Sequence, residues 1–120
     1  ITPGIPDKKM VYSVTRSFYH QLVSSGVHIF EWTPGFCHAK MSIADDRMAT
    51  CGTINLDYRS MYLHFECGVW CYKTEAVLQL KEDALAVIGQ SQQIDLEFCK
   101  HRFVGVRMIQ TCLRLLAPLL

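Results

Sequence analysis

Apolar side chains near the start of the chain recur every four residues, at Met10, Val14, Phe18 and Leu22. This spacing places them close to one face of a helix. Asp7 precedes the pattern as a candidate N-cap, and Gly26 follows it as a typical terminator. The pattern therefore predicts a helix over residues 8–24.

The middle of the chain consists of short apolar runs separated by turn residues. Such runs, bounded by Gly, Pro and Asp, are typical of strands. We expect turns at Thr33-Pro34-Gly35 and at Asp45-Asp46-Arg47. The predicted strands cover residues 27–32, 36–44, 48–51 and 65–72.

A second helical pattern begins at Thr74, a good N-cap, and runs to about Gly89. Residues 90–95 then form a polar break, and residues 103–116 are a last apolar helix candidate. Helices that alternate with strands predict the α/β class, with a mixed sheet flanked by helices. The apolar face of the second helix is formed by Val77, Leu80, Ala84 and Ile88.

The composition limits the class of protein. With 120 residues the chain forms one domain at most, and because it begins with Ile1 rather than Met we expect it to be cut from a longer protein. A net charge of +1 with 19% charged residues provides no broad basic surface, so nucleic acid is not an expected partner. No apolar stretch reaches the roughly 18 residues that suggest a membrane span.

The six cysteines include no C-x-x-C pair, and several lie in apolar strand-like runs. We therefore expect reduced cysteines that pack as small hydrophobic residues. A zinc site at His64, Cys67 and Cys71 is disfavoured, because in an extended strand His64 lies on the face opposite to both cysteines.

The most informative segment begins at His38. His38 and Lys40 are two residues apart, so they share one face of the predicted strand. An imidazole can act as a nucleophile toward phosphorus or as a general acid and base, and Lys40 supplies a positive charge beside it. Thr53 and Asn55 can donate hydrogen bonds to phosphate oxygens. These groups together predict a site that handles phosphate esters.

The spacing of these residues resembles the signature H-x-K-x4-D-x6-G-(S/T)-x-N of the phospholipase D superfamily, matched from His38 to Asn55. The segments TPGIPDKK, FEWTPGF, NLDYRSMYLHFECGVW and RLLAPLL resemble the bacterial cardiolipin synthase family. The resemblance implies that residues 1–120 are part of the second of two phospholipase D-like domains, truncated at its N-terminus. In such enzymes the two domains are related by a pseudo-twofold axis.

The resemblance also implies a reaction. In the family, one motif histidine attacks the phosphodiester of phosphatidylglycerol and forms a phosphohistidine. The other histidine protonates the leaving glycerol and then deprotonates the hydroxyl of a second phosphatidylglycerol, which gives cardiolipin. His38 belongs to the second motif and is assigned the acid/base role.

The remaining site residues follow from the same resemblance. Lys40, Thr53 and Asn55 would hold phosphate oxygens. Glu66 stands where the family places a carboxylate that orients the histidine. Asp45 is expected to accept hydrogen bonds at the end of its strand.

The expected partners are the phosphatidylglycerol substrate, an anionic membrane surface and the missing N-terminal half of the enzyme. The expected location is the bacterial cell membrane, with the catalytic part facing the cytoplasm. Neither a metal nor a cofactor is expected, because the sequence has no Gly-rich phosphate loop and no acidic cluster suited to magnesium.

Three alternatives remain open. A phospholipase D-type hydrolase would use water in place of the lipid alcohol. A metal-independent phosphodiester nuclease would act as a homodimer, although the near-neutral charge argues against it. An isolated fragment with a single motif histidine would be inert.

Other residues have simpler interpretations. Asp57 and Arg59 are expected to brace the loop after Asn55 by ion pairing and hydrogen bonds. For residues 108–120, an amphipathic helix on anionic lipid and a helix packed against the missing half both remain open. Four aromatic residues are expected mostly in the core: Tyr58, Tyr62, Phe65 and Trp70.

Overall fold

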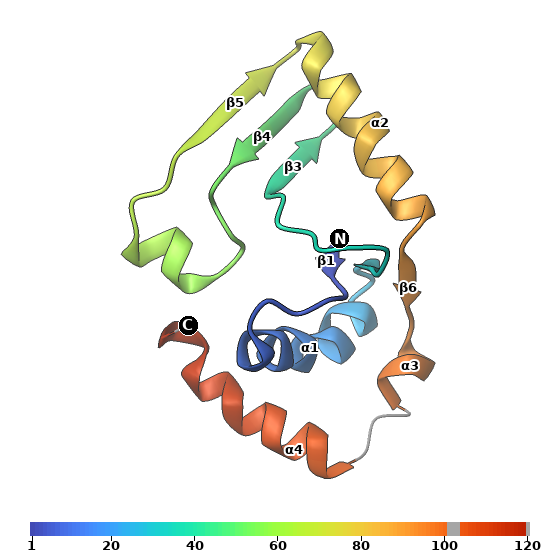
Figure 1. Cartoon of the computed structure of the whole chain (residues 1–120), viewed down its shortest axis with the longest axis vertical. Coiled ribbons are helices and arrows are strands. Elements are labelled where there is room, and N and C mark those ends of the chain that lie inside the picture. The colour runs from blue at the N-terminus through green and yellow to red at the C-terminus, as the bar shows by residue number, and fades with distance from the viewer. Residues whose placement is uncertain (101–103, 120) are drawn as a thin grey trace. The chain divides into compact units, whose positions relative to one another are not determined.

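The computed structural model describes residues 1–100 and 104–119. The chain forms two compact units, one made of Ile1–Cys37 with Ser91–Leu120 and the other of His38–Gln90. Each unit contains one three-stranded sheet and its own helices (Figure 1). The predicted α/β class is confirmed, with the strands divided between two small sheets.

The first unit is built around the sheet β1-β2-β6. Strand β1 runs parallel to β2, and β6 pairs antiparallel with β2, so that Ile29 faces Ile94. The buried core contains Tyr19, Ile29, Ile94 and Cys99. The unit comprises β1 (Thr2–Pro3), α1 (Lys9–Ser24), β2 (Ile29–Trp32), β6 (Gln92–Ile94), α3 (Leu96–Lys100), α4 (Val104–Leu113) and the 3₁₀ turn η2 (Arg114–Leu119).

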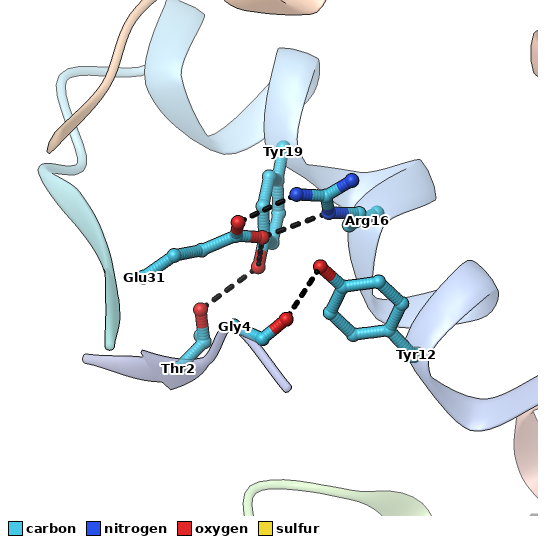
Figure 2. Close-up of polar contacts among 6 residues, drawn as sticks. All are labelled: Thr2, Gly4, Tyr12, Arg16, Tyr19 and Glu31. Carbon is cyan, nitrogen blue, oxygen red and sulfur yellow. Dashed lines mark hydrogen bonds and ion pairs between the residues drawn. The ribbon is translucent and has the colours of Figure 1, made fainter. Parts of the chain in front are cut away.

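A buried carboxylate lies beside this core. Glu31 on β2 is only 2% exposed, and Arg16 of α1 binds it through Nε to Oε1 at 2.8 Å and through a terminal nitrogen to Oε2 at 2.5 Å (Figure 2). Tyr19 donates its hydroxyl to Oε1 at 2.9 Å and therefore accepts the hydrogen bond that joins it to Thr2. Burial raises the pKa of Tyr19, and the hydrogen bond to Glu31 raises the pKa of Arg16.

The second unit is an antiparallel sheet of order β3-β4-β5 with one α-helix (Figure 1, teal to orange). The helix α2 packs against all three strands and contributes the buried Val77, and β4 contributes the buried Ala49. The elements are β3 (Met41–Ala44), β4 (Met48–Gly52), the π-helical turn η1 (Arg59–Leu63), β5 (Gly68–Tyr72) and α2 (Glu75–Gly89).

One tight turn and one close approach of two strands fix the register of this sheet. Asp45 and Asp46 both have positive φ, and Arg47 N donates to Ala44 O at 3.1 Å, as in the tight hairpin turns that suit twisted strands. This confirms the predicted turn. At the other end Gly52 faces Gly68 so closely that a Cβ on Gly52 would lie 2.3 Å from the oxygen of Cys67. Only glycine permits this approach of the two strands.

The predicted helices are confirmed, with corrections at their ends. Helix α1 begins at Lys9, and its N-cap is Lys8 with no side-chain capping bond, so the prediction of an Asp7 cap was wrong. Thr74 is the N-cap of α2 by position, but its side chain makes no capping hydrogen bond. The last helix is observed from Val104 onward, while position 103 lies outside the described residues.

The predicted core face of α1 was only partly correct. Val14 is buried, but Met10 and Leu22 are exposed, and Tyr19 is buried instead. Residues four apart drift by about 40° per step around a helix with 3.6 residues per turn, so the pattern does not stay on one line. The Tyr19 hydroxyl also donates a hydrogen bond to the buried carboxylate of Glu31, which a purely apolar pattern cannot predict.

Several strand and burial predictions differ from the structure. The strand predicted over residues 36–44 is only Met41–Ala44, and the one predicted over residues 65–72 is only Gly68–Tyr72. The predicted polar break contains β6, whose polar residues Gln92 and Gln93 pair with β2. A strand can form there because its backbone hydrogen bonds come from a distant partner, which local polarity does not reveal.

The prediction of four core aromatics was wrong, because Tyr58, Tyr62, Phe65 and Trp70 are all exposed. The six cysteines are free, as expected, but Cys99 is buried while Cys51, Cys67 and Cys112 are exposed. In the described part of the chain, no helix is both long and apolar enough to cross a membrane.

Candidate active site

Four of the predicted site residues come together at one edge of the sheet of the second unit, namely His38, Lys40, Thr53 and Glu66. Lys40 immediately precedes β3, Thr53 follows β4, and Glu66 lies two residues before β5. The strands are antiparallel neighbours, so the start of β3, the end of β4 and the start of β5 share this edge. Gly52 N donates to Lys40 O at 3.1 Å, and Thr53 N donates to Cys67 O at 2.9 Å. These backbone bonds hold the three polar segments together.

His38 and Lys40 are in direct contact. The Lys40 ammonium lies 2.8 Å from both ring nitrogens of His38 and donates to the His38 carbonyl at 2.9 Å. Both residues belong to an irregular segment before β3. The predicted proximity of the two side chains is therefore found, but a strand is not its cause. Only one nitrogen of a neutral imidazole carries a free lone pair, so the tautomer decides which of the two ring nitrogens accepts from Lys40.

Thr53 and Glu66 form the second pair of the site. The Thr53 hydroxyl donates to Glu66 Oε2 and accepts from Cys67 N at 3.0 Å. Hydrogen bonds from Thr53 and then Ser60 lower the pKa of Glu66, and the electrostatic influence of His64 and Lys40 acts in the same direction. The carboxylate is therefore ionised at neutral pH and lies within the electrostatic reach of Lys40.

The loop between β4 and β5 is folded back by its own polar groups. Asp57 accepts a hydrogen bond from Ser60 N at 2.7 Å, and Ser60 is buried inside the π-helical turn. Arg59 donates through Nε to His64 Nε2. The hydrogen bonding expected of Asp57 and Arg59 is confirmed, but the expected ion pairing is not, because the two ion pairs among the described residues involve neither side chain and Arg59 binds a histidine. Short π-helical turns occur frequently at functional sites.

Two predicted residues are not part of the hydrogen-bonded cluster. Asp45 lies in the turn at the far end of β3, roughly 15 Å along the chain from Lys40 at the usual rise of a strand. Its neighbour Asp46 binds Lys81 of α2 at 2.6 Å, which ties the hairpin to the helix. Asn55 is exposed in the loop two residues after Thr53. Its carboxamide makes no hydrogen bond to any residue that the structure describes.

Sequence reasoning missed Ser60 and His64. Both lower the pKa of Glu66, Ser60 through a hydrogen bond and His64 electrostatically. Neither belongs to the motif spacing, and Ser60 reaches Glu66 because the turn fixed by Asp57 reverses the chain. The pairing of Glu66 with Thr53 was likewise not predicted, since Glu66 was expected to orient the histidine.

The arrangement offers an imidazole, an ammonium and a hydroxyl on one accessible edge of a small sheet. Such groups can bind the oxygens of a phosphate ester and transfer a proton to or from an adjacent oxygen. Within residues 1–100 and 104–119, no group of three or more His, Cys, Asp or Glu side chains is suited to hold a metal ion.

Comparison with known proteins defines the class. Residues 1–87 match the family described as "Cardiolipin synthase, PLD-like domain". The chain therefore belongs to the family of cardiolipin synthases with a phospholipase D-like domain, as the resemblance implied.

The similar proteins are bacterial. Over its whole length, the chain is 42% identical to an uncharacterised protein of Streptococcus mutans, 38% identical to a cardiolipin synthase of Geobacillus sp. WCH70 and 35% identical to cardiolipin synthase 2 of Bacillus anthracis. It covers 26%, 24% and 23% of these proteins, so it spans about a quarter of their length. No solved structure matches the chain.

Proposed function

We propose that this chain supplies the second-motif half-site of an enzyme that transfers a phosphatidyl group between two phosphatidylglycerol molecules. The contact of the Lys40 ammonium with the His38 ring carries this proposal. It places a fixed positive charge next to a group that can exchange a proton. The family membership supports the same reaction, since the named relatives are cardiolipin synthases.

The proposed reaction has two balanced steps. In the first, the histidine of the other half attacks phosphorus, a nitrogen–phosphorus bond forms, and the bond to the glycerol oxygen breaks as His38 gives that oxygen a proton. In the second, His38 takes the proton from the hydroxyl of another phosphatidylglycerol, whose oxygen displaces the first histidine. Lys40 and Asn55 bind the non-bridging oxygens on which charge is concentrated in the transition state.

Glu66 and Thr53 are proposed to position the other groups. Glu66 is anchored by Thr53 and Ser60, and its negative charge lies near Lys40. This charge holds the ammonium at the sheet edge where the phosphate would bind. Asp45, at the far end of β3, is proposed to keep the hairpin turn and not to contact the substrate.

The surface next to the site supports a lipid substrate and the anionic membrane as its source. The loop between Asn55 and Glu66 exposes large apolar side chains at Leu56, Tyr62, Leu63 and Phe65. Several exposed apolar side chains in one loop are expected where lipid or another protein binds. We propose that the missing N-terminal half completes the site at a bacterial cell membrane, with the catalytic part facing the cytoplasm.

The test replaces the matching segment of the Geobacillus cardiolipin synthase with this chain and follows labelled phosphatidylglycerol by thin-layer chromatography, with chelator present. Cardiolipin and glycerol should form, and His38→Ala should lower the rate at least about 100-fold, the usual contribution of a general acid or base. His28→Ala, at an exposed histidine of the other unit, is the matched control and should leave the rate unchanged.

Other outcomes would contradict specific parts of the proposal. Phosphatidic acid in place of cardiolipin would assign a hydrolase. Activity that survives His38→Ala would exclude the acid/base role. Activity lost with chelator would overturn the metal-independent reaction. The unmodified Geobacillus enzyme shows that the assay works, and circular dichroism shows that each variant is folded.

A further inference from the structure

A polar cavity of about 190 Å³ lies in the first unit, apart from the residues of the candidate active site. Side chains of α1, α3, α4 and the start of η2 line it. Sites for drug-sized ligands usually occupy about 300–1,000 Å³, so this cavity suits a small ion or head group and not an acyl chain.

The lining is basic. Arg16, His20 and Arg114 all line the cavity. Glu31 fixes Arg16 through two hydrogen bonds, as Figure 2 shows. Arg114 donates through Nε to the Ser17 hydroxyl at 3.0 Å, and its guanidinium lies 4.3 Å from the ring centre of Phe18. Both guanidinium groups are thus held in place before any ligand binds.

The positive charge of Arg114 is not neutralised locally. Its polar partners, Ser17 and Gln21, are uncharged. Among the described side chains, no carboxylate lies within 4.0 Å of it, since the two ion pairs found there join Arg16 to Glu31 and Lys81 to Asp46. A fixed guanidinium with unused donors is well suited to bind the oxygens of a phosphate.

Among the described residues, Gln110 adds an unpaired hydrogen-bond acceptor to the cavity. This residue is only 6% exposed and lines the cavity. Its side-chain oxygen is buried and has no hydrogen-bond partner in the part of the chain that the structure describes. A buried acceptor without a donor is unfavourable, so a ligand that brings a hydroxyl group would satisfy it.

We propose that this cavity binds a phosphate group that still carries a proton. Its charged oxygens would contact Arg114 and Arg16, and its P–OH would donate to the Gln110 oxygen. Free phosphate and the head group of a phosphate monoester lipid share this chemistry, because each keeps a titratable proton near pH 6. A phosphodiester such as the proposed substrate has no such proton, so the cavity is a separate site and does not depend on the proposed reaction.

The test is calorimetric titration of the whole 120-residue chain with inorganic phosphate at pH 6 and constant ionic strength. Phosphate should bind at one saturable site, and sulfate, which carries no proton, should bind about ten-fold more weakly. Arg114→Gln should weaken phosphate binding about ten-fold or more, as expected for the loss of a charge-assisted hydrogen bond. Arg47→Gln removes an exposed arginine from the other unit and should have no effect.

Vesicles distinguish the two sources of the phosphate. The lipid head group is the ligand if the chain binds vesicles that contain phosphatidic acid more tightly than it binds free phosphate. This binding should depend on Arg114 and should be absent with vesicles of phosphatidylcholine alone. Tighter binding of free phosphate assigns the ion. Absence of both kinds of binding, equal binding of sulfate, or unchanged binding by Arg114→Gln would overturn the proposal.

Arg114 also contacts Ser17, so a second variant guards against a failure to fold. Gln110→Met removes the acceptor and keeps both guanidinium groups. It should abolish the preference for phosphate over sulfate while an anion still binds. The unmodified chain should also melt at a higher temperature in phosphate than in chloride of equal ionic strength, because a ligand of the folded state stabilises it. An unchanged melting temperature would contradict the proposal.

Discussion

The Glu66 carboxylate shows how single hydroxyl groups set the charge of this site. Thr53 and Ser60 donate hydrogen bonds to it, and these bonds favour the ionised form. The Thr53 hydroxyl has a second structural function, since it accepts a hydrogen bond from Cys67 N. One side chain therefore joins the end of β4 to the segment before β5 and also stabilises the acid.

Thr53→Val should raise the pKa of Glu66 toward its ordinary value, because the donor that lowers it most is lost. Carboxyl carbon chemical shifts measured by NMR from pH 2 to 7 give this pKa directly. Thr53→Ser keeps the hydroxyl and is the matched control, with a pKa close to that of the unmodified chain. A pKa that moves equally in both variants, or in neither, would show that the hydroxyl does not govern Glu66.

One contact of the candidate site could be predicted from the spacing of its residues. The contact of His38 with Lys40 followed from their separation by one residue, although an irregular segment and not a strand brings them together. The role of Ser60 was not predictable, since it depends on a turn that Asp57 stabilises and on backbone that reverses direction.

At the level of elements, the sheet of the second unit determines where the polar segments meet. Its register places Gly52 opposite Gly68, so Thr53, just after β4, and Glu66, two residues before β5, lie at the same edge. The strand positions were largely predicted from short apolar runs, and β4 was found at its expected position. The starts of β3 and β5 were not predicted, because pairing with a neighbour decides where a strand begins, whereas their last residues, Ala44 and Tyr72, agree with the prediction.

Gly52→Ala should destabilise this edge. The added Cβ would lie 2.3 Å from Cys67 O and 2.5 Å from Gly68 Cα, and both are backbone atoms. The strands would have to separate, and by analogy with overpacked cores we expect a loss of about 2 kcal/mol in the free energy of unfolding. Urea denaturation followed by circular dichroism measures this loss.

Gly89→Ala provides the control for this prediction. Gly89 ends α2, and a Cβ there would meet nothing within 4 Å. Alanine is the better helix former, so this variant should be as stable as the unmodified chain or slightly more stable. Equal stability of the two variants would show that the close approach at Gly52 is not limiting.

At the level of the whole molecule, family membership was predictable and the division into two units was not. The first unit combines the two ends of the described sequence through the pairing of β6 with β2. Residues 92–94 have no apolar alternation that would indicate a strand, so their pairing with β2 could not be predicted from the local sequence. The candidate active site lies wholly in the second unit, and the phosphate cavity lies wholly in the first.

The buried ion pair offers a test of how these units are stabilised. Glu31 is 2% exposed and binds Arg16, Tyr19 and, through Tyr19, Thr2, which all belong to the first unit (Figure 2). Glu31→Gln would leave the guanidinium of Arg16 without its anion. We expect a loss of about 2–3 kcal/mol in the free energy of unfolding, less than for a fully buried pair because the Arg16 side chain is 24% exposed.

Hydrogen exchange read by mass spectrometry locates this loss. If each unit is stabilised by its own core, Glu31→Gln should lower protection in α1, β2 and β6 and leave β4, β5 and α2 unchanged, because the residues that contact Glu31 all lie in the first unit. Glu82→Gln, at an exposed acid on α2, is the control and should change neither region. Equal loss of protection in both units would instead mean that they unfold as one cooperative structure, so that the ion pair also supports the sheet edge that carries His38 and Lys40.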